Sequence, residues 1–146
     1  MSSAPAAHLL LHGAIVLLVG LLDGAPYGRA IAVKDDELIR AWKLAHLSLS
    51  LGGATLVAVA AALAQLTAGP VWLRWGLALS WIASGYGFTF SMNLEPLVRA
   101  RGLRWVPGWA GNNAVYVGNL VGALGSAVGA GLLIAAAAFE VSRLPR

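Results

Sequence analysis

The sequence predicts an all-α fold, an integral membrane bundle of four helices. Of the 146 residues, 59% are apolar and only 11% are charged, whereas a soluble domain carries about 25% charged residues. The charges gather in two short stretches and at the C-terminus, and long uncharged apolar runs separate them. Four such runs match the roughly 17–25 residues that a helix needs to cross a bilayer.

The predicted spans form one domain over residues 1–146 and lie at about residues 6–22, 38–66, 71–94 and 112–139. The D-G-A-P sequence at 23–26 ends the first span, and a charged loop is expected over residues 27–40. T-A-G-P at 67–70 separates the second and third spans, and Glu95-Pro96 ends the third. Connections this short predict an up-down-up-down order with both termini on one side of the membrane.

The basic residues indicate how the chain lies in the bilayer. The net charge is +4, and many Lys and Arg residues flank apolar runs, so we expect contact with lipid headgroups and not with nucleic acid. Residues 1–11 contain no Lys or Arg, so the first run is expected to be a retained helix and not a signal peptide. Most basic residues follow the first and third spans, which predicts that these two loops are cytoplasmic.

Composition also limits the chemistry. The chain has no cysteine, which excludes disulfides, thiolate metal ligands and cysteine nucleophiles. No carboxylate lies within a predicted span, so neither a buried acid–base pair nor a proton-driven transporter is expected. No phosphate-binding loop is present. Chemistry within the membrane would therefore use histidine, tyrosine, asparagine, serine or a bound cofactor.

A histidine inside the second span is the most informative polar residue. Trp42, His46, Ser50 and Gly53 share one helical face, together with Val57, because successive residues turn by about 100°. This face combines an imidazole, an aromatic ring, a hydroxyl and a glycine gap against which a flat ligand could lie. Imidazole is a common axial ligand of haem iron. The alternative is a histidine that hydrogen-bonds to a neighbouring helix.

Two further histidines lie in the first span. His8 and His12 are four residues apart, so they face the same way, and such a pair can bind a metal. No carboxylate of this span accompanies them. An interfacial histidine and an interhelical hydrogen bond therefore explain the pair more simply. His12 remains a candidate second ligand or proton carrier.

Small and polar residues recur at helical spacing in the third and fourth spans. Tyr86 and Asn93 share one face of the third span, and both can donate a hydrogen bond. Asn112, Tyr116 and Asn119 share a face of the fourth span, which predicts a polar cavity or an interhelical hydrogen-bond network. Two sets of small residues predict close helix packing, within one subunit or between subunits: Ser80, Ser84, Gly87 and Ser91, and Gly118, Gly122, Gly125 and Gly129.

Several segments together resemble styrene-oxide isomerase and its small four-helix membrane relatives. They are Leu11-His12-Gly13, the R-A-W-K-L-A-H sequence at 40–46, the W-I-A-S-G-Y-G-F-T-F-S-M sequence at 81–92, and Asn112-Asn113. The order, the spacing and the total length are similar, from about His12 into the fourth span. The ordered set carries the resemblance, since each motif alone is of low specificity.

The resemblance implies a homotrimer in the bacterial inner membrane that binds haem b near a subunit interface. Ferric iron would act as a Lewis acid that opens a hydrophobic epoxide, and a hydride shift would give a carbonyl compound, a Meinwald rearrangement without net redox change. The axial histidine of the family carries over to His46, with Trp42, Ser50 and Gly53 as further haem contacts. Tyr86, Asn93 and Tyr116 are the expected catalytic positioning groups.

The chain departs from the family pattern near the expected substrate. The family has an asparagine six residues after the axial histidine, where this chain has Gly52, and an acid before the third-span tryptophan, where it has Ser80. The family's third-span tyrosine aligns either near Tyr86 or onto Phe88. Loss of the asparagine enlarges the pocket and removes a donor, so a bulkier or aliphatic epoxide is expected.

Two other functions are consistent with the sequence. The first is a haem protein with different chemistry, such as an electron carrier in which His12 closes the second axial position. The second is a structural membrane subunit without a cofactor. The visible spectrum of the purified protein distinguishes all three.

Overall fold

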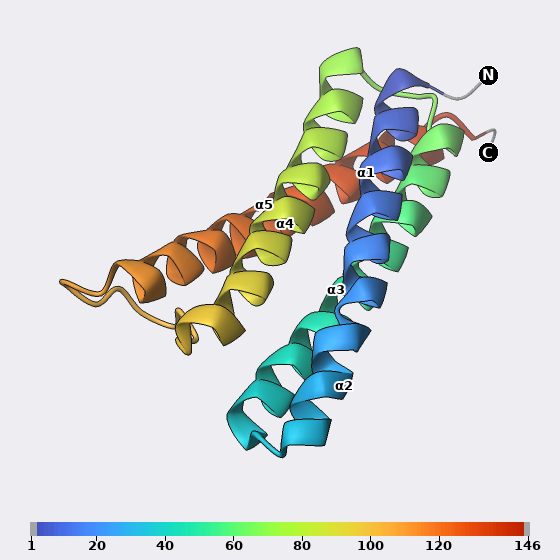
Figure 1. The fold of residues 1–146 in the computed structure, drawn as a ribbon. Coiled ribbons are helices and arrows are strands. Elements are labelled where there is room, and N and C mark those ends of the chain that lie inside the picture. The colour runs from blue at the N-terminus through green and yellow to red at the C-terminus, as the bar shows by residue number, and fades with distance from the viewer. Residues whose placement is uncertain (1–2, 145–146) are drawn as a thin grey trace.

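The regular structure of the protein is helical. A computed structural model describes residues 3–144 (Figure 1); helix makes up 84% of the structure, and these residues form no strand. The segments are α1 (Ala4–Leu22), α2 (Gly24–Val33), α3 (Asp36–Gln65), α4 (Val71–Val98) and α5 (Ala110–Val141). Only Asp23 separates α1 from α2, so the five segments make four rods. The predicted all-α, four-helix membrane class is confirmed.

Three of the rods are long and apolar enough to cross a membrane. They cover Ala4–Val33, Asp36–Gln65 and Ala110–Val141. The remaining rod, α4, has 28 residues, but its polar residues keep it less apolar than the other three. It packs against α1, α3 and α5. Its polar face is therefore covered by other helices, which is where polar side chains in a membrane protein are tolerated.

The predicted loop over residues 27–40 is largely wrong, because most of it is helix. Asp23 keeps right-handed helical angles (φ −63°, ψ −13°), so the chain bends there without unwinding. Pro26 lies in the first turn of α2, where the missing proline N–H has no intrahelical partner to lose. The actual turn is Lys34-Asp35, with Lys34 in the left-handed region at φ 56°.

The predicted break at Glu95-Pro96 is also displaced. Helix α4 continues to Val98 with Pro96 inside its last turn, and Arg99 in the left-handed region ends it. A proline this close to the C-terminus interrupts few of the helix hydrogen bonds. The loop between α4 and α5 is therefore shorter than the sequence predicts.

Helices α1 and α3 form a close pair through glycine. A Cβ atom on Gly20 would collide with the backbone of Ser50, and one on Gly53 would collide with the backbone of Leu17. Such direct backbone contact replaces the hydrophobic driving force that helices lack inside a bilayer. The contact also fixes which residues of α1 lie beside which residues of α3.

Helices α4 and α5 form the second close pair. The two predicted small-residue sets, one on each helix, face each other in this contact. A Cβ on Gly87 would lie 2.7 Å from the nitrogen of Gly122, and one on Gly125 would lie 2.8 Å from the oxygen of Ser80. The hydroxyl of Ser84 donates to the carbonyl of Gly122 at 2.8 Å. The glycine face of α5 thus packs against α4 of the same chain. Of the two predicted alternatives, packing within one subunit is therefore the one that the structure shows for this face.

The order of the rods is up-down-up-down, as predicted. The carboxylate of Glu140 accepts hydrogen bonds from the amides of Thr67 and Ala68 at 3.0 and 2.8 Å. The end of α5 therefore lies beside the α3–α4 connection, at the same end of the molecule as the start of α1 (Figure 1). Helix α5 crosses α4 obliquely and, in the described structure, packs on no other helix.

The opposite end is held by ion pairs. The guanidinium of Arg99 lies 2.9 Å from the carboxylate of Asp35 and 3.0 Å from that of Glu37. Asp35 also caps α3 by accepting from the amide of Leu38 at 3.1 Å. The pKa of Asp35 lies below its ordinary value of 3.8, mainly because of the hydrogen bond from the Leu38 amide and to a smaller extent because of the Arg99 guanidinium.

Substitution of Gly53 by alanine should destabilise the α1–α3 pair. The added methyl group meets the backbone of Leu17, which cannot rotate away, and overpacking of this kind costs about 1–3 kcal/mol. The thermal unfolding midpoint in detergent measures the effect. Gly131→Ala is the matched control, because no atom lies within 4 Å of a Cβ built there. Equal midpoints for the two variants would show that the α1–α3 contact is looser than described.

Substitution of Arg99 by glutamine should lower the unfolding midpoint near neutral pH. Folding lowers the pKa of Asp35. The ionised carboxylate therefore stabilises the fold above its ordinary pKa of 3.8, and this stabilisation is lost as the pH falls through the pKa of the folded state. The difference between wild type and Arg99→Gln should therefore shrink in acid. Arg29→Gln serves as the control, and a difference that persists in acid would contradict this account.

Candidate functional site

The imidazole of His46 is held in one orientation by a backbone atom. Its Nδ1 lies 2.7 Å from the carbonyl oxygen of Gly20. A carbonyl only accepts, so Nδ1 carries the proton and Nε2 keeps its lone pair in the neutral ring. No described residue hydrogen-bonds to Nε2. Metal-ligating histidines are typically held in this way, with the second nitrogen donating to a carbonyl.

The ring of His46 lies at the bend between α1 and α2. Tyr27 stacks on it with ring centroids 6.3 Å apart and an interplanar angle of 22°. A Cβ on Gly24 would lie 3.4 Å from the imidazole. Residues at the bend therefore pack against the imidazole, and the histidine itself belongs to α3.

A buried carboxylate lies in the same region and was missed by sequence reasoning. Asp23 is only 5% exposed and lies within the Ala4–Val33 span. The expectation that no span contains a carboxylate is therefore wrong. The cause is the flanking Gly24 and Pro26, which suggest a turn although the helix only bends. A lone acid between two apolar runs was the signal that could have identified it.

Asn93 of α4 is the partner of this carboxylate. Its Nδ2 lies 3.5 Å from the Asp23 carboxylate and 3.0 Å from the carbonyl of Thr89. Asp23 also interacts electrostatically with His46. The structure thus brings Asn93, Asp23 and His46 together as a polar cluster inside an apolar bundle. Ionisable residues at such depth mark functional sites by default.

The other predicted members of the His46 face lie against protein. Gly53 contacts the backbone of Leu17, so the predicted glycine gap is filled by α1 and is not open to a flat ligand. The hydroxyl of Ser50 is buried, and it has no hydrogen-bond partner in the part of the chain that the structure describes. Trp42 is half-buried one turn before His46. The space over Gly53 is therefore closed within this chain, and only Nε2 of the imidazole is left without a described hydrogen-bond partner.

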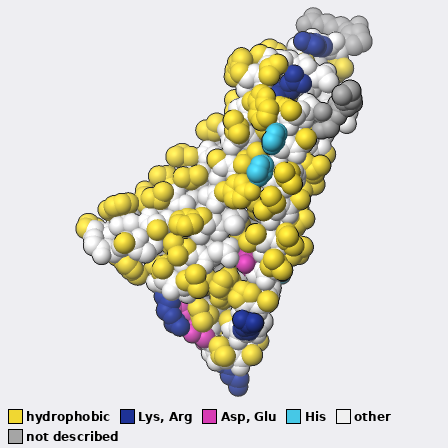
Figure 2. Space-filling view, turned by 45° about the horizontal axis from the view of Figure 1, so that its top comes forward, with side chains coloured by type: hydrophobic (Ala, Val, Ile, Leu, Met, Phe, Trp, Pro, Cys, Tyr) yellow, Lys and Arg dark blue, Asp and Glu magenta, His cyan; other side chains and the backbone are white. Residues whose placement is uncertain are grey.

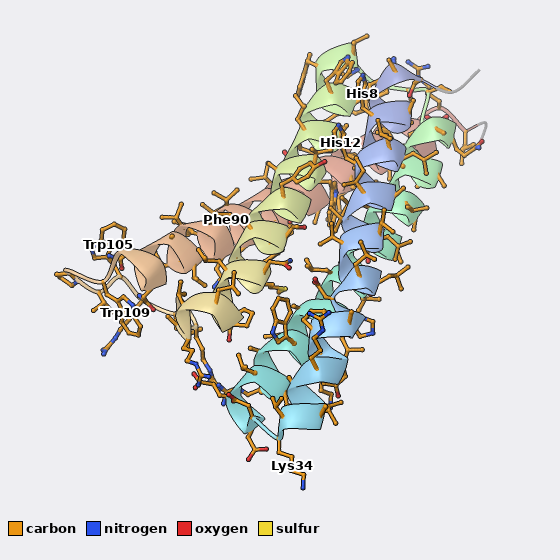
Figure 3. All side chains as sticks on the ribbon, in the orientation of Figure 1. His8, His12, Lys34, Phe90, Trp105 and Trp109 are labelled. Atoms are coloured by element: carbon orange, nitrogen blue, oxygen red, sulfur yellow. The ribbon has the colours of Figure 1, made fainter. Side chains whose placement is uncertain are left out.

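Tyr86 lies in a different place from His46. Its hydroxyl is 2.8 Å from Nδ1 of His12, and the His12 ring meets it edge-on. His8 stacks on His12 at 6.3 Å and lies 5.5 Å from the ring of Trp75. This aromatic cluster lines the contact of α1 with α4 (Figure 3), and histidine side chains are visible among hydrophobic ones on that face (Figure 2).

The distance along α1 separates His12 from His46. Gly20, the partner of His46, lies eight positions after His12, which corresponds to about 12 Å of helix. Two nitrogens on one iron are only about 4 Å apart, at roughly 2 Å from the metal each. Within one chain His12 therefore does not reach the metal position of His46. It makes the interhelical hydrogen bond that the simpler explanation predicts.

The polar face of α5 forms a hydrogen-bond network with the α4–α5 loop. Asn112 donates to the carbonyl of Arg104 at 2.7 Å, and Asn113 makes two bonds of 2.8 Å with the backbone of Val106. Tyr116 meets Trp105 edge-on at 6.4 Å. These side chains fasten the α4–α5 loop, and Tyr116 is not brought near His46 by this chain.

A pocket of about 370 Å³ lies between α3 and α4, and Gly52 lines it. Its walls are mostly apolar and include Leu56 of α3 and Phe88, Met92 and Trp81 of α4. No atom lies within 4 Å of a Cβ built on Gly52, so the space there is open. Phe88 and Trp81 are the aromatic residues of α4 that line the pocket, and Tyr86 does not line it.

Three of the four hydroxyls that line this pocket already donate to the backbone. The hydroxyls of Thr55, Ser84 and Ser126 donate to backbone carbonyls at 2.9, 2.8 and 2.9 Å. The indole nitrogen of Trp81 is buried without a described partner and faces Gly129. The pocket thus offers a ligand an almost wholly apolar surface.

His46 and the Gly52 pocket lie on different sides of α3. A step of six residues turns a helix by about 600°, so the two positions point about 120° apart. In agreement, His46 faces Gly20 of α1, whereas Gly52 faces Trp81 and Phe88 of α4. One chain therefore does not present both to the same ligand.

No group of three or more histidine and carboxylate side chains that could hold a metal ion exists in residues 3–144. This chain can therefore offer a bound metal a single imidazole. Haem needs no more, because the porphyrin supplies four nitrogens and the protein an axial ligand. The donor set at His46 fits that requirement.

Comparison with known proteins gives one result for the whole chain. The family model described as styrene oxide isomerase matches residues 5–138. No curated protein and no solved structure matches the chain. The match covers all four rods, including His46, Asn93 and the Gly52 pocket. The chain therefore belongs to the styrene oxide isomerase family.

Proposed function

We propose that this protein is a haem b-dependent membrane isomerase that converts an epoxide into a carbonyl compound. The observation that carries the proposal is the His46 imidazole, whose Nδ1 donates to Gly20 and whose Nε2 is unpaired, in a chain of the styrene oxide isomerase family. His46 would be the axial ligand. When bound, ferric haem supplies the Lewis acid that polarises the epoxide oxygen.

The residues of the chain would bind and orient the substrate. The Gly52 pocket would hold the apolar body of the epoxide, since its lining is mostly apolar and three of its four hydroxyls donate to the backbone. A rearrangement by hydride shift needs no net proton transfer, so the absence of an acid–base pair in this pocket is consistent with the reaction. Of the predicted positioning groups, Asn93 is the one that lies beside the His46 cluster.

The placement of His46 and Gly52 on different sides of α3 favours a composite site. If one copy contributes the imidazole and a second contributes the pocket, the two can meet the same ligand between subunits. The outer face of α5, which packs on no helix but α4 in the described chain, offers surface for such an assembly. A homotrimer in the bacterial inner membrane is the assembly that we propose.

A haem electron carrier has less support. That function would need a second axial ligand, and the candidate histidine, His12, is hydrogen-bonded to Tyr86 about 12 Å along α1 from the His46 partner. An open axial position is what a substrate-binding haem requires.

Purified wild-type protein should show a haem Soret band, and His46→Ala should lose it or shift it strongly. The reason is loss of the only axial imidazole that the chain places at this site. His12→Ala is the matched control and should keep the band, because its imidazole serves an interhelical hydrogen bond. A wild type that stays colourless after haem is added would refute the proposal and leave a structural membrane protein as the function.

Substitution of Gly52 by leucine should fill the pocket and exclude long substrates. We expect kcat/KM for a long-chain aliphatic epoxide to fall roughly tenfold or more, and that for styrene oxide to fall less. The Soret band should be retained, since Gly52 has no side chain that could ligate the iron. Gly131→Leu, also at a position with open space, should leave both rates unchanged. Equal losses for both epoxides would show that the substrate binds elsewhere.

A further inference from the structure

A second pocket, which the proposed function does not use, lies near the end of the molecule that carries the α4–α5 loop. Its volume is about 510 Å³, and α3, α4 and this loop all contribute to its lining. It is larger than the Gly52 pocket and differs from it in charge. Charged side chains gather at this end of the surface (Figure 2).

Three cationic side chains line this pocket without an ion-pair partner. Arg40 and Lys43 come from α3, and Arg101 comes from the loop after α4. In the part of the chain that the structure describes, the ion pairs all belong to Arg99, which holds Asp35 and Glu37. Asp35 and Glu37 are therefore committed to Arg99, and no described carboxylate forms an ion pair with the three cations.

One carboxylate also lines the pocket. Glu95 of α4 is half-buried and interacts electrostatically with Arg101 and Arg40 without a direct ion pair. It can balance only one of the three positive charges. The pocket therefore keeps a net positive charge.

Apart from Asn119 of α5, the remaining walls are apolar. Leu44 and Leu47 of α3 are 48% and 55% exposed, and Leu103 of the loop is 76% exposed; Met92 of α4 completes this side. A small inorganic anion would leave these side chains without a partner. A ligand that fits the whole pocket has a negative head and a hydrocarbon tail.

The pocket lies at the depth where such ligands have their charged groups. Arg40 and Lys43 lie in the first turns of α3, and the loop that carries Arg101 also carries the interfacial residues Trp105 and Trp109. Tryptophan and basic residues together mark the headgroup region of a bilayer. The leucines of α3 point from there toward the hydrocarbon.

We propose that this pocket binds an anionic phospholipid. The phosphate group would lie among Arg40, Lys43 and Arg101, and an acyl chain would lie along Leu44 and Leu47. Basic pockets between membrane helices bind lipid headgroups on electrostatic grounds. The lipid would connect α3 with the α4–α5 loop, two parts of the chain that are far apart in sequence.

The test uses full-length protein in a mild zwitterionic detergent. Native mass spectrometry counts bound phosphatidylglycerol, and the unfolding midpoint is measured with added phosphatidylglycerol or phosphatidylcholine. The variant R40Q/K43Q/R101Q removes the three cations. R104Q is the matched control, because Arg104 lies in the same loop and does not line the pocket. Lys43→Gln alone, an exposed position, serves if the triple variant does not fold.

Wild type and R104Q should retain phosphatidylglycerol and be stabilised by it, more than by phosphatidylcholine. The triple variant should bind it on the order of a hundredfold more weakly, and Lys43→Gln on the order of fivefold more weakly, at about a factor of five per cation. Equal binding by wild type and the variants would overturn the proposal. So would a variant that keeps the lipid but loses haem, because the cations would then hold the carboxylates of the haem. A colourless wild type that still binds the lipid would refute only the proposed function.

Discussion

Direct contact between helix backbones is the constraint on which this structure depends. Inside a bilayer, helices gain little from burying apolar side chains against one another, so they associate where small residues let backbones approach. In this chain Gly20 and Gly53 permit the contact of α1 with α3, and Gly87, Gly118 and Gly122 permit that of α4 with α5. The α1–α3 contact carries the Gly20 carbonyl to His46, so packing and site geometry have one origin.

The arrangement of the residues around His46 depends on the bend between α1 and α2. Because the chain stays helical at Asp23, the first rod continues past the carboxylate and buries it, with Asn93 of α4 as its partner. The same bend brings Tyr27 over the imidazole. A single imidazole and a polar cluster lie on one side of α3, and an apolar pocket lies on a different side. Such a division suits a reaction in which a cofactor provides the electrophile and the protein provides shape.

Much of the fold could be predicted from the sequence, because long apolar runs and stripes of small residues are local signals. The four rods and the pairing of the two small-residue sets are of this kind. Pro26 and Pro96 misled the boundaries, since proline breaks a helix only where a backbone hydrogen bond is lost. The site was harder. The spacing that grouped Trp42, His46, Ser50 and Gly53 is correct for one helix, but α1 fills the space over Gly53. Tyr86 and Tyr116 were chosen by residue type, and only the tertiary structure shows that His12 and Trp105 are their neighbours.

The partner of His46 is a main-chain carbonyl, and every amino acid carries one. Substitution of side chains around the imidazole leaves that acceptor in place as long as the backbone of α1 keeps its path. The residues that line the Gly52 pocket can therefore change over evolutionary time without disturbing the orientation of the His46 imidazole. A family built in this way can acquire new substrates by drift in its pocket, and a glycine in place of the asparagine is one such change that the fold accommodates without repair elsewhere.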